Sequence, residues 1–252
     1  MRALVPLVAL CVASCAYPRR STPLSEVADV SDIDAPADLW RLRFTRAVVP
    51  PRQRGDRPWD EDGTPPDPFV RLYRGDRQVY ESPIAHDTLT PAWDDALTEN
   101  LRLPSTRELR IELWDDDGVG LPEPVGVWRG HGLPRTALPG ADARVMLEGT
   151  AEVGFVVMPP RAYRGTGITE YEVRPDALHV LGVIPLSPAG RAGIVPGTDI
   201  LAIDGETVAE LGDRAIGKLS MAASRRSTLT LRHSDGRRED VRLDSGYVWK
   251  AR

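Results

Sequence analysis

The sequence predicts a mainly β protein in which an antiparallel β-sandwich is followed by a small β-barrel with two helices. Short runs of alternating apolar and polar residues recur along the chain, and this period of two is typical of strands. Turn residues separate the runs, since the 252 residues include 23 Pro and 22 Gly. The pair Pro159-Pro160 is the expected boundary, which gives domains at residues 39–159 and 160–248.

The first domain is expected to contain seven or eight short strands. Leu39–Phe44 shows the pattern, because Leu39, Leu42 and Phe44 are separated by polar or amphipathic residues. Many short strands at regular spacing favour a sandwich of two antiparallel sheets. The other expected strands are Phe69–Tyr73, Leu97–Leu103, Leu109–Trp114, Val125–Trp128, Arg144–Leu147 and Val153–Val157.

The second domain is expected to combine strands with two helices. The segments Pro188–Gly193 and Asp213–Ala223 are the expected helices, and the second is the longer. The expected strands are Leu178–Ile184, Asp199–Ile203, Thr228–Leu231 and Glu239–Leu243.

The N-terminus has the features of a secretory signal. A basic Arg2 precedes an apolar run, Ala3–Ala13, that is too short to span a bilayer. The motif Val12-Ala13-Ser14-Cys15 is similar to the bacterial lipobox. The resemblance implies a signal peptide at 1–15, diacylation of Cys15 and anchoring in the bacterial envelope. Ala16 after the cysteine, in place of Asp, favours the outer membrane. The alternative is a plain signal peptide with a chance cysteine.

Composition excludes several classes of function. Residues 16–38 are rich in Ser, Pro, Asp and Ala with little periodicity, and are expected to form a flexible tether. Cys11 would leave with the signal peptide, so the mature chain would have no free thiol and no disulfide. A net charge of −5 without a basic stripe argues against nucleic acid as a partner.

Two acidic loops are the main candidate for a functional site. One follows the run Leu109–Leu113 and places carboxylates at positions i, i+2 and i+8, in Asp115, Asp117 and Glu123. The other lies upstream, at Trp59–Phe69. Carboxylates that meet at one end of a sandwich repel one another unless they hold a hard divalent cation. The pattern therefore predicts a calcium-binding module.

Three motifs in this domain point to one family. They are Asp67-Pro68-Phe69, the turn Thr88–Asp94 and the loop Asp115–Gly126. With them, residues 39 to about 159 resemble a C2 domain, a calcium- and lipid-binding β-sandwich. The calcium ligands that the resemblance implies are Asp67, Asp115, Asp117 and Glu123, together with either Asp60 or Asp62. Strict spacing in the first loop falls on Glu61, which leaves that choice open.

A calcium-binding C2 domain has alternatives. One is a domain that keeps the fold and binds no metal, with its acids merely solvated. An EF-hand is excluded, because Pro58 and Leu113 stand where its first ligand is required. Phospholipid headgroups are further candidate partners, since Val119 and Leu121 lie at a loop tip and can insert shallowly. The acidic loops carry no Lys or Arg at 60–68 or 115–127, so calcium is expected before lipid.

The second domain carries motifs of another family. They are Gly165-Thr166-Gly167-Ile168, Val183–Ile194 and Pro196–Val208. With them, residues 163 to about 243 resemble a bacterial PDZ domain of the kind found beside periplasmic proteases. The resemblance implies that a peptide adds as a strand beside Ile168–Val173. The alternative is a domain that packs against its neighbour and binds nothing.

The peptide contacts implied by this resemblance are specific. Backbone N–H groups of the first motif would bind the terminal carboxylate of the peptide. Its last side chain would enter an apolar pocket beside a helix that no histidine begins, so hydrophobic C-terminal tails of envelope proteins are the expected partners. The implied peptide-binding residues are Gly165, Thr166, Gly167, Ile168, Ile216 and Leu219.

Catalysis is not expected. The sequence has no Gly-x-Ser-x-Gly, His-Glu-x-x-His or phosphate-loop motif, and its four histidines are isolated. The sequence therefore predicts a non-enzymatic envelope lipoprotein that binds calcium and protein tails as an adaptor or scaffold. One alternative is an accessory or regulatory subunit of an envelope protease or secretion system. Another is calcium-dependent phospholipid binding.

Overall fold

The structure is a computed structural model, and it describes residues 17–27, 35–60, 62–118, 120–148, 150–222, 224–244 and 246–251. The predicted signal peptide and Cys15 lie outside these residues. The chain divides into two compact units. The sandwich unit comprises Glu26–Tyr163 with Trp249–Arg252, and the mixed unit comprises Met1–Ser25 with Arg164–Val248. No helix in the described ranges is long and apolar enough to cross a membrane.

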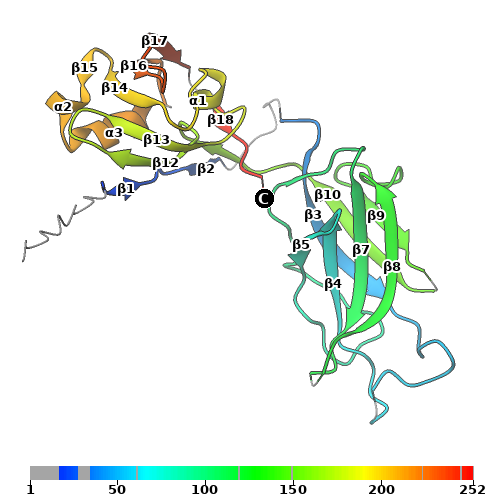
Figure 1. The fold of residues 1–252 in the computed structure, drawn as a ribbon. Helices are drawn as coiled ribbons and strands as arrows, with labels where there is room; N and C mark the ends of the chain where they lie inside the picture. The colour runs from blue at the N-terminus through cyan, green and yellow to red at the C-terminus, as the bar shows by residue number, and fades with distance from the viewer. Residues whose placement is uncertain are drawn as a thin grey trace, which may run out of the picture. The chain divides into compact units, whose positions relative to one another are not determined.

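The sandwich unit is built from two four-stranded antiparallel sheets (Figure 1). One sheet has the order β6-β3-β10-β9 and the other β5-β4-β7-β8. The predicted antiparallel sandwich is therefore confirmed. The strands are β3 (Leu39–Val48), β4 (Pro68–Arg74), β5 (Arg77–Glu81), β6 (Leu101–Arg102), β7 (Glu108–Asp115), β8 (Glu123–His131), β9 (Asp142–Met146) and β10 (Glu152–Met158).

The core of the sandwich lies between these sheets and follows the alternation of the strands. In β7, every second residue is buried, from Leu109 through Ile111 and Leu113 to Asp115. Successive side chains of a strand point to opposite faces, so Asp115 continues the apolar row that faces the core. The strand thus ends with a carboxyl group on its buried face.

The mixed unit contains a seven-stranded antiparallel sheet in the order β1-β12-β13-β14-β16-β17, with β15 beside β14. Its own apolar core, which includes Ile168, Tyr171 and Leu219, is separate from that of the sandwich. A PDZ-type barrel stays a prediction. The strands are β1 (Arg19–Arg20), β12 (Ile168–Val173), β13 (Leu178–Val183), β14 (Asp199–Ile203), β15 (Glu206–Thr207), β16 (Ser227–Arg232) and β17 (Arg238–Leu243).

In the described part of the mixed unit, the helices are α1 (Pro188–Arg191), α2 (Val208–Leu211) and α3 (Arg214–Ala222). The first and last lie within the two predicted helices. Helix α2 was not predicted from the sequence. Its start is fixed by a capping box, in which the Thr207 Oγ1 accepts from the Glu210 N–H at 3.2 Å and the Glu210 carboxylate accepts from the Thr207 N–H at 2.9 Å.

Two short parts of residues 16–38, the segment predicted to be a flexible tether, pair with other strands. Residues 19–20 form β1, which pairs antiparallel with β12 (Figure 1). Farther along, β2 (Ser25–Val27) belongs to a three-stranded sheet with β11 (Ala162–Arg164) and β18 (Tyr247–Val248). Each pairing involves only two or three residues, so the segment shows no strand period. These two parts are held by backbone hydrogen bonds to strands that are distant in the sequence.

Candidate functional site

The two acidic loops meet at one end of the sandwich. Strands β4 and β7 are antiparallel neighbours, and Pro68 at the start of β4 stands opposite Asp115 at the end of β7. The loop before β4 and the loop after β7 therefore lie side by side. Carboxylate oxygens of Asp60, Asp115 and Asp117 all lie within 4.8 Å of one another. We call these three residues the acidic cluster.

Asp115 is the buried member of the acidic cluster, with an exposed fraction of 0%. Its Oδ1 accepts a hydrogen bond from the Asp67 N–H at 2.7 Å, whereas its buried Oδ2 has no hydrogen-bond partner among the described residues. Burial, the largest cause, and the negative charges of Asp60 and Asp117 together raise the pKa of Asp115 to about 6, although the hydrogen bond from the Asp67 N–H opposes the rise. A buried carboxylate oxygen without a donor fits a cation ligand, because it otherwise stays unsatisfied.

The other two members have similar electrostatics. Partial burial raises the pKa of Asp117, and repulsion from Glu123 and Asp60 adds to the rise. Burial also raises the pKa of Asp60, although a hydrogen bond from the Thr64 hydroxyl opposes this. The cluster thus concentrates negative charge that a divalent cation neutralises.

Asp67 lies at the edge of the acidic cluster and has partners of its own. Its Oδ2 is 2.9 Å from His86 Nδ1, and its Oδ1 accepts from the Asp87 N–H at 2.7 Å. The hydrogen bond to Asp67 raises the pKa of His86. Asp67 also contributes to the raised pKa of Asp115. The predicted ligand is therefore close enough to act on the cluster through its charge, while both of its oxygens are engaged by neighbours.

The structure separates the two first-loop alternatives. Asp60 belongs to the cluster, whereas the Asp62 Oδ1 accepts from the Thr64 N–H at 3.0 Å and from the Thr64 Oγ1 at 2.7 Å. This local Asx turn directs the Asp62 carboxylate to its own loop. Glu61 lies outside the described residues. The predicted ligand Glu123 accepts a hydrogen bond from Gln53 Nε2 at 2.5 Å and does not belong to the cluster.

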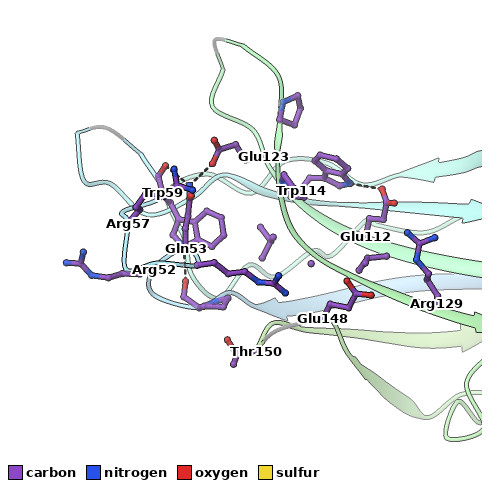
Figure 2. Close-up of a pocket in the computed structure, with 17 residues that line it drawn as sticks. Arg52, Gln53, Arg57, Trp59, Glu112, Trp114, Glu123, Arg129, Glu148 and Thr150 are labelled. Atoms are coloured by element: carbon purple, nitrogen blue, oxygen red, sulfur yellow. Dashed lines mark hydrogen bonds between the residues drawn. The ribbon is translucent and has the colours of Figure 1, made fainter.

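A pocket of about 840 Å³ adjoins Glu123 on the side of the first loop (Figure 2). Arg52, Arg57 and Trp59 come from this loop, and Trp114 and Arg129 come from β7 and β8. Sequence reasoning missed the pocket, because the acidic loop was taken to begin at position 59. The three arginines immediately before it, at 52, 54 and 57, are exposed.

The tip of the other loop is apolar. Leu121 has 88% of its surface exposed. Val119, the other predicted insertion residue, lies outside the described residues. An exposed leucine at the acidic end of the sandwich has the chemistry needed to enter the surface of a bilayer.

The predicted peptide-binding residues lie in the mixed unit. The Thr166 Oγ1 accepts from the Ile168 N–H at 3.2 Å, and its carbonyl accepts from the Ala189 N–H at 2.9 Å. Gly167 has a φ of +83°, and a Cβ there would lie 2.1 Å from the Ser187 Cβ. The loop is thus fixed against the start of α1, which gives Gly167 a structural role.

The other predicted peptide-binding residues, Gly165, Ile216 and Leu219, differ in their surroundings and burial. Gly165 packs against the Leu24 side chain, because a Cβ at Gly165 would lie 2.4 Å from Leu24 Cδ2. On α3, Ile216 is half-buried, whereas Leu219 is fully buried in the core of the mixed unit. Leu219 therefore supports the sheet from within.

Comparison with known proteins gives one family. Residues 48–130 match the model of the C2 domain. Among curated proteins, none matches the chain.

Solved structures with similarity include a C2 domain of plant Extended Synaptotagmin 1, at 21% identity and a TM-score of 0.36, covering 50% of this chain and 98% of that chain. A calcium-bound structure of two C2 domains of Extended-Synaptotagmin 2 has 17% identity and a TM-score of 0.37, covering 56% and 48%. Human GIVD cytosolic phospholipase A2 has 14% identity and a TM-score of 0.36, covering 65% and 21%. The chain thus spans less than two thirds of the last two.

The matched range includes β4 and β7, which bring the two acidic loops together. It also includes the three carboxylates of the acidic cluster. The match to the C2 domain model therefore covers the part of the chain that carries the candidate site.

Proposed function

We propose that the protein binds calcium at the acidic cluster and, with calcium bound, docks on phospholipid membranes. The observation that carries the proposal is the convergence of Asp60, Asp115 and Asp117, one of which has a buried oxygen without a donor. Calcium takes six to eight oxygen ligands, and clustered carboxylates with nearby loop carbonyls and water supply such a set.

Different residues of the chain have different roles in the proposed docking on a membrane. Asp60, Asp115 and Asp117 hold the cation, whose charge offsets theirs and attracts phosphate oxygens of lipid headgroups. Arg52 and Arg57 line the neighbouring pocket and offer guanidinium groups, which bind phosphate well. The exposed Leu121, in the loop after β7, enters the bilayer surface.

Calorimetric titration with calcium tests the metal site. We expect heat of binding for the wild type and none for Asp115→Asn/Asp117→Asn. The matched control is Asp94→Asn/Asp95→Asn, which removes the same charge from exposed positions in the same unit and leaves the heat unchanged. A wild type that releases no heat contradicts calcium binding.

Flotation with liposomes tests docking. The chain carries Cys15→Ala, so that acylation does not anchor it. We expect it to float with phosphatidylserine vesicles in calcium and to stay behind in chelator. Leu121→Asp and Arg52→Glu/Arg57→Glu should each reduce the floated fraction severalfold without changing the calorimetric heat. Calcium binding without flotation would restrict the site to ion binding.

A second role belongs to the mixed unit, and we propose that it binds extended peptides as a PDZ-type module. The supporting observation is that β12, whose other edge pairs with β13, accepts an additional antiparallel strand. With Cys15 diacylated, the protein is then a non-enzymatic adaptor of the bacterial envelope, at the outer membrane, for C-terminal tails of envelope proteins. The alternative role is an accessory or regulatory subunit of an envelope protease or secretion system, which would bind its partner's peptide at the same edge of β12.

Peptide capture distinguishes this role from a purely structural unit. Peptides with a free, hydrophobic C-terminus should bind, and amidated versions should bind several times more weakly. Ile216→Lys should reduce capture, whereas Met221→Lys, at an exposed position on the same helix, should not. Equal binding of the acid and amide forms contradicts carboxylate recognition by the Gly165–Ile168 loop. Mass spectrometry of membrane-extracted protein tests acylation of Cys15.

A further inference from the structure

The edge of β12 is already occupied by the chain's own N-terminal segment. In the antiparallel pairing, Arg19 stands opposite Glu172 and Arg20 opposite Tyr171. Beyond the strand, the Val173 N–H donates to the Pro18 carbonyl at 3.0 Å. A row of backbone hydrogen bonds of this kind is how an extended peptide adds to a sheet edge.

The segment continues along β12 to the glycine loop. After Arg20 the chain passes Thr22, which is 5% exposed, and reaches Leu24. Leu24 Cδ2 and the Pro23 carbonyl lie 2.4 Å and 3.3 Å from the position of a Cβ on Gly165. The segment therefore pairs with the Val173 end of β12 and contacts the glycine loop at Gly165, where it places an apolar side chain.

Charge complementarity supports the pairing. Arg19 forms ion pairs with Glu170 at 3.6 Å and Glu172 at 3.8 Å. The Arg174 guanidinium lies 5.8 Å from the centre of the Tyr17 ring. The Arg19 side chain is 64% exposed, so these ion pairs are weak and the pairing is reversible. Because the β12 edge carries two glutamates, it favours bound peptides with a basic residue opposite them. In the attached segment this residue stands five positions before the apolar residue at the glycine loop.

We infer that residues 18–24 are an intramolecular ligand of the β12 edge and compete with external peptides that carry the same Arg and Leu spacing. The inference rests on the proposed peptide-binding function of this edge. Because the segment is covalently attached, its effective concentration is high, and an external peptide binds only the fraction of molecules in which it has left. A segment docked nine tenths of the time weakens external binding about tenfold.

The test uses a labelled synthetic peptide with the sequence of residues 17–24, whose binding to the full chain is followed by fluorescence anisotropy. The variant Arg19→Glu/Leu24→Asp removes the attached competitor, since a glutamate at position 19 would face Glu170 and Glu172. We expect it to bind the peptide about tenfold more tightly than the wild type. The control Arg242→Glu/Val195→Asp makes comparable changes at exposed positions of the mixed unit and should match the wild type.

Hydrogen exchange at the Val173 amide gives a second measurement. This amide should be protected in the wild type and exchange faster in the variant, because its acceptor is Pro18. Equal peptide affinity in wild type and variant overturns the competition while leaving peptide binding intact. If neither form binds the peptide, the proposed peptide-binding function fails as well. An unprotected Val173 amide in the wild type contradicts docking itself.

Discussion

Asp115 shows how strand period and site chemistry meet in one residue. The apolar row Leu109, Ile111 and Leu113 fixes the face on which it lies, and Asp115 follows on the same buried face. Burial consequently raises the pKa of its carboxyl group to about 6. A buried carboxylate without a full set of donors destabilises the fold until a cation binds.

The pH dependence of stability follows from this. In the unfolded chain the pKa of Asp115 is near 3.8, and in the folded chain it is about 6, so the folded state favours the protonated form. Its contribution to stability is fully present below pH 3.8 and is lost as pH rises through about 6. Without calcium, Asp115→Asn should therefore stabilise the sandwich at pH 7, by up to about 3 kcal/mol.

Urea unfolding in chelator at pH 4 and pH 7 measures this effect. The gain should be present at pH 7 and largely absent at pH 4, and the exposed Asp94→Asn should show neither. With calcium the order reverses, because the wild type alone keeps all three ligands. A loss of stability in Asp115→Asn at pH 7 in chelator would show that the carboxylate is already compensated.

At the scale of single residues, the sequence identified some of the residues of the acidic cluster and left others open. The i, i+2 spacing was sufficient to predict Asp115 and Asp117 as neighbours. It left Asp60 and Asp62 open, because the choice depends on which carboxylate accepts the Thr64 N–H in a turn. Glu123 shares the predicted spacing, yet in the structure its carboxylate accepts from Gln53, which lies 70 residues away in the sequence. Such a contact leaves no local pattern.

Among the elements, the strands with long alternating runs were predictable and the short ones were not. β7 and β10 carry continuous buried faces, which specify both their type and their register. β1 has only two residues, and its partner strand lies about 150 positions away, so composition suggested a tether. Long-range backbone pairing decides the structure of such segments.

The loop before β12 gives a prediction on steric grounds. Gly167→Ala should destabilise the mixed unit by about 2–4 kcal/mol, because its Cβ would lie 2.1 Å from Ser187 and its φ is +83°. Gly193→Ala is the matched control, since its φ is +78° and its Cβ would meet nothing within 4 Å. It should cost about 1 kcal/mol, the effect of backbone strain alone. Thermal unfolding compares the two, and equal losses would contradict the clash.

At the scale of the whole molecule, the buried apolar residues form two separate cores, one in the sandwich unit and one in the mixed unit. A change of pattern led us to expect the boundary at Pro159-Pro160, and the two units divide between Tyr163 and Arg164. The assignment of residues 17–25 to the mixed unit was not predictable, because it depends on β1.

The separate cores predict a selective response to calcium. At a concentration of 100 times Kd, calcium should stabilise the sandwich unit by about 2.7 kcal/mol. Scanning calorimetry should then show two transitions, of which one shifts upward by several degrees. Asp115→Asn/Asp117→Asn removes this shift and leaves the other transition in place. A calcium shift of both transitions, or of neither, contradicts the prediction.

The pairing of β1 with β12 also limits how far the mixed unit can lie from a lipid anchor at Cys15. For a chain anchored at Cys15, three peptide units separate the anchor from Pro18, so docking holds the β12 edge within about 10 Å of the lipid attachment point. Once β1 leaves, the next paired residue is Ser25 in β2, and the extended chain spans about 35 Å. Exchange of the attached segment for an external tail would therefore change the accessible height of the mixed unit above the membrane, so that capturing a partner and moving away from the bilayer surface become a single event.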